Sequence, residues 1–152
     1  MKIDYLVKYE EYINTISEWL YNQWGYHYPE KTREDYLNGV KKRLNKKTVP
    51  TTFIAIENKK PVGTASLIEH DMDNHQHLTP WLADVYVKPE VRNQGIGTNL
   101  VNRVLKEAKD IDIDCVYLFT REAKNLYFKI GWEKLKTARY HGDIVDIMFY
   151  DL

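Results

Sequence analysis

Residues 83–98 of this chain read ADVYVKPEVRNQGIGT and predict, in order, a strand, a tight turn and the start of a helix. Val85 and Val87 lie on either side of Tyr86, and these residue types favour an extended chain. Pro89 ends the strand because proline has no N–H group to donate to a neighbouring strand. The chain must therefore change direction shortly after this strand.

Two glycines supply the predicted turn. Gly95 and Gly97 allow backbone dihedral angles that other residues avoid, and they leave no side chain above the peptide groups. Successive N–H groups can therefore converge on a bound anion. The helix that is expected to open at about Thr98 adds unpaired N–H groups and the positive end of its dipole. The sequence thus predicts a phosphate-binding turn between the strand and the helix.

Other structures contain similar glycine patterns. A nucleotide-binding P-loop would require Gly-Lys-Ser/Thr, whereas Gly97 is followed by Thr98 and Asn99 without a lysine. A dinucleotide-binding turn would require a third glycine where this chain has Leu100, and it would not contain the bridge from Lys88 to Asn93. An ordinary glycine-rich turn before a helix remains a third interpretation of the pattern.

Two motifs carry a resemblance to a known family. Residues 92–97, RNQGIG, resemble the Arg/Gln-x-x-Gly-x-Gly/Ala pyrophosphate loop of the GNAT superfamily of acyl-CoA-dependent N-acyltransferases. Residues 126–132, LYFKIGW, resemble the Leu-Tyr-x-Lys-Leu-Gly-Phe block that follows later in those proteins. The resemblance covers about Phe53 to Tyr150. It is weak before Phe53, where members of the superfamily diverge and usually recognise their acceptors.

The composition is typical of one globular domain. A chain of 152 residues can bury about two-thirds of its unfolded surface without disulfides or metal, so residues 1–152 are expected to form a single domain. Lys and Arg number 22 and so do Asp and Glu, which argues against nucleic-acid or membrane binding through bulk charge. Cys115, the only cysteine, lies in an apolar run and is expected to be buried rather than nucleophilic. The charged residues within Met1–Leu20 leave no signal-peptide core, so a cytoplasmic protein is expected.

Apolar periodicity predicts the remaining elements. Further strands are expected at Ile3–Val7, Thr51–Ile56, Val62–Ile68, Cys115–Phe119, Trp132–Arg139 and Ile144–Tyr150. Helices are expected from Tyr9 to Trp24, after the capping residue Thr32, from Thr98 to Ile111 and from Glu122 to Ile130. These elements predict a single α/β (α+β) domain with a mixed, mostly antiparallel sheet of about six to seven strands and about four helices.

Two polar segments are interpreted as solvent-exposed. The basic cluster at the end of the second helix is expected to be a solvated face; it comprises Lys41, Lys42, Arg43, Lys46 and Lys47. The segment Asp71–His77 alternates acids and imidazoles, but this spacing is not typical of a ligand set and few apolar residues anchor it. A loop is therefore expected there, and no metal site.

The resemblance implies where a cofactor would bind. It implies that the two central strands, ending near Val87 and Phe119, splay apart and admit acetyl-CoA as cosubstrate. The backbone of Val85, Tyr86 and Val87 would pair with pantetheine, and the turn would hold the pyrophosphate through Gln94, Gly95, Ile96, Gly97 and Thr98, with Arg92 and Asn93 placing it. Thr120 stands where many members carry an asparagine that contacts the cofactor, so that contact is an open question.

Acetyl transfer to an amine requires a base, an oxyanion contact and an acid. Asp84 is the candidate base because it is expected to share one strand face with Leu82 and Tyr86, and it matches an aspartate beside the acceptor in polyamine acetyltransferases. Glu69 or ordered water is the alternative base, and a purely structural ion pair remains open for Asp84. The resemblance implies that the hydroxyl of Tyr127 protonates the departing thiolate. A backbone N–H of Val85 or Tyr86 would polarise the thioester carbonyl.

The expected acceptor is a cationic amine. The segment Ile68–Val87 contains four acidic residues and no lysine or arginine, and Tyr26, Tyr28 and Trp81 could add aromatic faces to the acceptor side. The chain is therefore interpreted as an acetyl-CoA-dependent N-acetyltransferase acting on a small molecule or a peptide, as a monomer or homodimer. The alternative is a non-catalytic acyl-CoA sensor or interaction module, which would bind acetyl-CoA without turnover.

Overall fold

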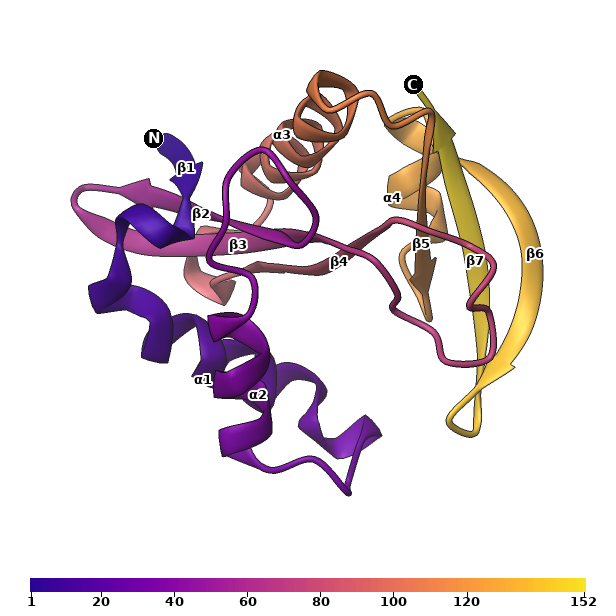
Figure 1. The fold of residues 1–152 in the computed structure, drawn as a ribbon, viewed down its shortest axis with the longest axis horizontal. Coiled ribbons are helices and arrows are strands. Elements are labelled where there is room, and N and C mark those ends of the chain that lie inside the picture. The colour runs from indigo at the N-terminus through magenta and orange to yellow at the C-terminus, as the bar shows by residue number, and fades with distance from the viewer.

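The computed structural model describes all 152 residues as one domain built on a seven-stranded sheet (Figure 1). The strands are β1 Lys2–Tyr5, β2 Thr51–Glu57, β3 Lys60–Ile68, β4 Trp81–Val87, β5 Cys115–Thr120, β6 Glu133–Tyr140 and β7 Asp143–Asp151. Their order is β1-β2-β3-β4-β5-β7-β6, and only the β4–β5 pair is parallel. The mixed, mostly antiparallel sheet predicted from the sequence is confirmed.

Helices cover both faces of the sheet. Helices α1 (Ile13–Trp24) and α2 (Arg33–Lys41) lie on one side, and α3 (Ile96–Asp110) and α4 (Lys124–Lys129) lie on the other (Figure 1). Before α1 the chain forms short 3-10 turns, so the regular helix begins later than the expected Tyr9. Thr32 caps α2 as predicted, because its hydroxyl accepts from the Asp35 N–H at 3.2 Å. None of these helices is long and apolar enough to cross a membrane.

An extra residue in β4 changes which way its side chains point. Thr64 and Ser66 of β3 pair with Tyr86 and Ala83 of β4, so one residue of β3 lies opposite two residues of β4. This β-bulge includes Asp84, whose φ is +56°. Leu82, before the bulge, packs in the cluster under α3, whereas Tyr86, after it, packs with α1 and α2. The prediction that Asp84, Leu82 and Tyr86 share one face is therefore wrong. A bulge shifts the two-residue alternation by one, and periodicity alone does not reveal it.

The parallel strands β4 and β5 separate directly after they meet. They share a single register pair, Trp81 with Tyr117, next to a hydrogen bond of 3.0 Å from the Tyr117 N–H to the Pro80 carbonyl. Beyond this point β4 and β5 run in different directions (Figure 1). The predicted splay of the central strands is confirmed.

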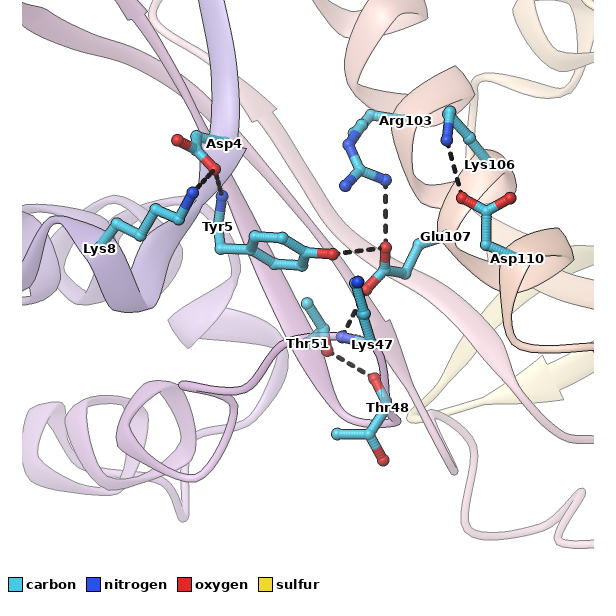
Figure 2. Close-up of polar contacts among 10 residues, drawn as sticks. All are labelled: Asp4, Tyr5, Lys8, Lys47, Thr48, Thr51, Arg103, Lys106, Glu107 and Asp110. Carbon is cyan, nitrogen blue, oxygen red and sulfur yellow. Dashed lines mark hydrogen bonds and ion pairs between the residues drawn. The ribbon is translucent and has the colours of Figure 1, made fainter.

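A buried carboxylate on α3 ties three segments together (Figure 2). Glu107 is 2% exposed and accepts hydrogen bonds from the Tyr5 hydroxyl at 2.8 Å and the Lys47 N–H at 2.8 Å. Arg103, one turn earlier on α3, pairs with the same carboxylate at 3.2 Å. The network joins β1, the segment before β2 and α3, which are far apart in the sequence.

Glu107→Ala should lower the free energy of unfolding by about 2–4 kcal/mol, because it leaves the buried Tyr5 hydroxyl and the partly buried Lys47 N–H without an acceptor and a guanidinium without its partner. Urea denaturation would measure the change. The control is Asp110→Ala, which removes an exposed ion pair with Lys106 on the same helix and should leave the midpoint unchanged. Equal effects of the two variants would show that the Glu107 network does not stabilise the fold.

Candidate functional site

The splay opens a cleft of about 690 Å³ between β4 and β5. Its walls include Leu82–Val85 of β4 and Leu118–Thr120 of β5, and α4 contributes Tyr127. Segments from the α1–α2 region and from the tip of the β6–β7 hairpin complete the lining. Because β4 is unpaired toward β5 beyond Trp81, its backbone groups on this side are free to bind a ligand.

The predicted glycine turn leads directly into α3. Gly95 adopts a φ of +85°, a conformation that strongly favours glycine, and the helix starts at Ile96. A Cβ atom built on Gly97 would meet a Val87 side-chain carbon at 3.6 Å, so this helix start lies against the end of β4. The first N–H groups of a helix have no partner within it. A helix start with unpaired N–H groups thus lies at one end of the open strand.

Arg92 connects the turn to β4. Its Nε donates a hydrogen bond of 2.8 Å to the Val87 carbonyl, and its guanidinium lies 5.5 Å from the centre of the Tyr86 ring. These contacts fix the position of the residues just before the turn, including Asn93, which adopts a φ of +65°. Arg92 is exposed, but these two contacts hold its side chain against the end of β4.

Tyr127 lies in the wall of the cleft opposite β4. Its ring packs edge-on against Trp132 at 5.9 Å between ring centres, and its hydroxyl has no hydrogen-bond partner within the protein. Burial raises the pKa of Tyr127 to about 12, so the hydroxyl keeps its proton at neutral pH. Thr120 supports this helix, because its hydroxyl accepts a hydrogen bond of 2.9 Å from the Ala123 N–H at the start of α4.

Asp84 is engaged in an ion pair. Its carboxylate binds the guanidinium of Arg43, and both side chains are about one-quarter exposed. The prediction that the whole basic cluster is solvated is therefore wrong for Arg43, which turns inward from the end of α2 while Lys42 remains exposed. The bulge places Asp84 on the face that α2 covers, and an uncompensated carboxylate there would be unfavourable.

Asp71 lines the cleft, although among the four acidic residues of Ile68–Val87 the sequence predicts only Asp84 and Glu69 as site residues. Asp71 lies in the loop between β3 and β4, lines the cleft and makes no hydrogen bond or ion pair through its carboxyl group. Burial, followed by the charge of Asp84, raises the pKa of Asp71 to about 7, whereas Arg43, Lys31 and Arg121 act in the opposite direction. The alternating acidic residues of Asp71–His77 give no sign in the sequence that Asp71 differs from its exposed neighbours.

The loop that carries Asp71 is anchored, contrary to the expectation from its composition. Met72 is fully buried, and the Tyr140 hydroxyl donates a hydrogen bond of 3.3 Å to the Asp71 carbonyl. Asn74 also donates to the Arg139 carbonyl at 3.1 Å, which ties the loop to β6. One buried methionine and two hydrogen bonds therefore anchor this loop, although it contains no run of apolar residues.

Aromatic and charged groups surround the mouth of the cleft. Tyr28 meets Tyr140 edge-on at 6.4 Å, while Tyr26 is 76% exposed at the rim. Arg121 binds the Asp143 carboxylate at 2.9 Å, and Arg43 binds Asp84 of the acidic segment. The acidic field expected from Ile68–Val87 is therefore partly balanced by cations from other segments.

Two predicted site residues do not reach the cleft. Trp81 is fully buried, and its Nε1 donates to the Leu78 carbonyl at 2.7 Å, so it belongs to the core. Glu69 is exposed after the end of β3, and its carbonyl accepts a bond of 2.6 Å from the Thr79 hydroxyl. Neither residue lines the cleft. The roles predicted for Trp81 and Glu69 in the site are corrected accordingly.

The fold thus has a splayed parallel strand pair with the start of α3 beside its open edge. Residues 13–132 match the profile of the Acetyltransferase (GNAT) family, and the chain belongs to this family. The match confirms the resemblance carried by the two motifs. No curated protein sequence matches at a significant level.

Solved structures share the fold at low sequence identity. An aminoglycoside 6'-N-acetyltransferase complexed with coenzyme A has a TM-score of 0.79 and 18% identity, covering 99% of this chain and 97% of its own. An aminoglycoside 6'-acetyltransferase type Ii has a TM-score of 0.77 and 19% identity over the same shares. A ribosomal-protein-alanine N-acetyltransferase from Brucella melitensis has a TM-score of 0.76 and 18% identity over 100% of both chains. Such a similarity establishes the fold.

Asp71→Asn should remove a pH dependence of stability. Because the pKa of Asp71 rises from 3.8 to about 7 on folding, the folded protein holds a proton that the unfolded chain releases between these values. This contribution to stability is complete below the unfolded pKa and is lost as the pH rises through about 7. The variant should match the parent at low pH and exceed it at about pH 8.

Urea midpoints measured across this pH range would test the effect. Asp73→Asn is the matched control, because Asp73 is exposed on the same loop and its removal should leave the pH dependence of the parent intact. Parallel curves for the parent and Asp71→Asn would contradict the raised pKa.

Proposed function

We propose that this protein transfers the acetyl group of acetyl-CoA to a primary amine of a cationic small molecule or peptide. The observation that carries the proposal is the open edge of β4, which ends beside the N-terminus of α3 at the Gly95–Gly97 turn. Membership of the acetyltransferase (GNAT) family supports acetyl transfer, and a solved structure of similar fold holds coenzyme A.

The cofactor would span the open strand and the helix start. The backbone groups of Val85–Val87 would pair with the pantetheine arm, and the N–H groups of Gln94–Thr98 would hold the pyrophosphate. Arg92 would act through the loop that it holds against Val87. This placement brings the thioester toward the part of the cleft that contains Tyr127.

Tyr127 would donate its proton to the departing thiolate. Its hydroxyl is protonated at neutral pH and has no protein partner, so it is available to the sulfur atom. A backbone N–H of Val85 or Tyr86 would stabilise the negative charge on the thioester oxygen. The chain thus contains candidates for both the acid and the oxyanion contact.

The opposite wall of the cleft suits an ammonium group. Tyr28, Tyr36 and Tyr140 line the cleft there, and aromatic rings attract cations by about 0.5–2 kcal/mol. The ammonium of Lys31 already lies over the Tyr28 ring, so this ring can hold a cation. Asp71 adds a carboxylate without an ion-pair partner. These features favour a cationic acceptor, although Arg43 already neutralises Asp84.

A screen of spermidine, kanamycin and a lysine-bearing peptide with acetyl-CoA, measured by thiol release, tests the function. Turnover of any of these amines above the rate of acetyl-CoA hydrolysis would support it. Calorimetric binding of acetyl-CoA without turnover of any amine would instead support the non-catalytic sensor.

Gly97→Glu should abolish acetyl-CoA binding without unfolding the protein, because its carboxylate would repel the pyrophosphate at the helix start. Isothermal titration calorimetry would measure the loss. Asn102→Glu adds the same charge at an exposed position further along α3 and should leave the affinity unchanged. An unchanged affinity in Gly97→Glu would mean that the phosphate site lies elsewhere.

Tyr127→Phe should lower kcat by roughly 10- to 1,000-fold with little change in acetyl-CoA affinity, because the ring remains and only the acid is removed. Steady-state kinetics and calorimetry together would separate these effects. Tyr9→Phe, outside the cleft, is the control and should retain the parent kcat. If Tyr127→Phe matches the parent across the pH range, the hydroxyl has only a packing role.

A further inference from the structure

Five carboxylates line the cleft. Three of them are engaged in a helix cap or an ion pair, and a fourth is exposed at its mouth. Asp35 closes the capping box of α2 by accepting from the Thr32 N–H at 2.9 Å. Asp84 is paired with Arg43, and Asp143 is paired with Arg121 and His27. Glu122 is exposed at the mouth of the cleft. Asp71 is the one carboxylate inside the cleft without a partner.

The cations near Asp71 are already engaged elsewhere. Arg43 binds Asp84, and Arg121 binds Asp143 at 2.9 Å. The ammonium of Lys31 lies over the Tyr28 ring, 5.0 Å from its centre. None of the three cations forms an ion pair with Asp71. Its carboxylate is therefore available to a group that enters from the cleft.

Two further polar atoms in the wall of the cleft lack partners. The hydroxyl of Tyr36 and the Nη2 atom of Arg121 are buried, and neither forms a hydrogen bond within the protein. Buried polar atoms are almost always satisfied, so these two atoms are exceptions within the protein. Both residues line the same cleft as Asp71.

The backbone around Asp71 holds its side chain in place. The Tyr140 hydroxyl donates to the Asp71 carbonyl at 3.3 Å, and the buried side chain of Met72 anchors the next residue in the core. The His75 N–H donates to the Met72 carbonyl at 3.1 Å and closes the following turn. A carboxylate on such a fixed loop can meet an acceptor in one defined orientation.

We propose that Asp71 is the group that takes the proton from the ammonium of the acceptor in this cleft. The proposal rests on acetyl transfer as the proposed function, and it replaces Asp84, which Arg43 occupies, as the base. Asp71 would touch the acceptor itself, because its carboxylate lines the cleft.

The proton transfers balance over the reaction. The carboxylate of Asp71 takes one proton from the ammonium and leaves a neutral amine, whose electron pair forms the C–N bond at the thioester carbon. The C–S bond then breaks with its electron pair on sulfur, and the thiolate takes the proton of Tyr127. The nitrogen loses its second proton through water to Tyr127. Asp71 releases its proton to solvent when the product leaves.

The surroundings tune Asp71 for this role. Burial and the charge of Asp84 raise its pKa to about 7, and the nearby cations Arg43, Lys31 and Arg121 limit the rise. The hydroxyls of Tyr28 and Tyr140 face the same region and remain protonated, since burial raises their pKa values. A base is most effective when its pKa lies near the working pH, because a large share of it is then ionised and it still binds a proton readily.

Steady-state kinetics of the full chain tests the proposal, using whichever of spermidine, kanamycin or the lysine-bearing peptide is turned over fastest. In the parent, kcat/KM for the amine should rise with pH and level off above about 7. Asp71→Asn should lower kcat by roughly 100-fold or more and lose this plateau, so that its rate continues to rise toward the ionisation of the free amine. Acetyl-CoA affinity, measured by calorimetry, should not change. The control Asp73→Asn should retain the parent profile.

Three results would overturn the proposal in distinguishable ways. A raised KM in Asp71→Asn with the parent kcat and pH profile would mean that Asp71 only attracts the ammonium. Full activity of the variant would exclude both roles while leaving the proposed function intact. If the parent binds acetyl-CoA but turns over none of the three amines, the proposed function fails and the role of Asp71 fails with it.

Discussion

The site depends on the incomplete pairing of the only parallel strands in the sheet. Strands β4 and β5 share one register pair, at Trp81 and Tyr117, and then separate. An unpaired strand inside a sheet is normally unfavourable, because its N–H and C=O groups lose their partners. Here the gap forms a cleft that is lined by β4 and β5. The position of this edge beside the first turn of α3 joins two sets of unpaired backbone groups in one site.

The bulge at Asp84 is the second constraint. It lets Leu82 and the valines beyond the bulge pack under α3, while Tyr86 packs against α1 and α2. Both faces of a central strand are thereby buried, but the carboxylate of Asp84 is turned toward α2. The end of α2 supplies Arg43, which compensates this charge. The same ion pair engages the carboxylate of Asp84, whereas the carboxyl group of Asp71 in the same cleft forms no ion pair.

Two ion pairs, rather than the net charge of the lining residues, determine the electrostatics of the cleft. The ion pair of Arg43 with Asp84 connects the chain after α2 to β4. The ion pair of Arg121 with Asp143 connects the end of β5 to the β6–β7 hairpin. Each pair both shapes the wall and prevents its carboxylate from attracting a cation on its own. Selectivity for an amine would therefore depend on Asp71 and on the surrounding aromatic rings, and much less on the overall acidity of Ile68–Val87.

The sequence by itself determined most of the helices and strands and the glycine turn before α3. Glycine at positions 95 and 97, valine at 85 and 87 and the capping pair Thr32 and Asp35 act through local backbone chemistry, which is readable from neighbouring residues. The motif at residues 126–132 likewise placed Tyr127 on a short helix beside the cleft.

Only the tertiary structure decided which acids and aromatics reach the cleft. Trp81 was predicted to add an aromatic face to the acceptor side, but it lies in the core where its strand meets β5. Arg43 belongs to a run of basic residues, yet it alone pairs with a carboxylate brought near by the β4 bulge. Asp71 resembles its neighbours, and its distinct environment arises from residues distant in the chain. Charge and burial depend on such long-range contacts, which no local pattern encodes.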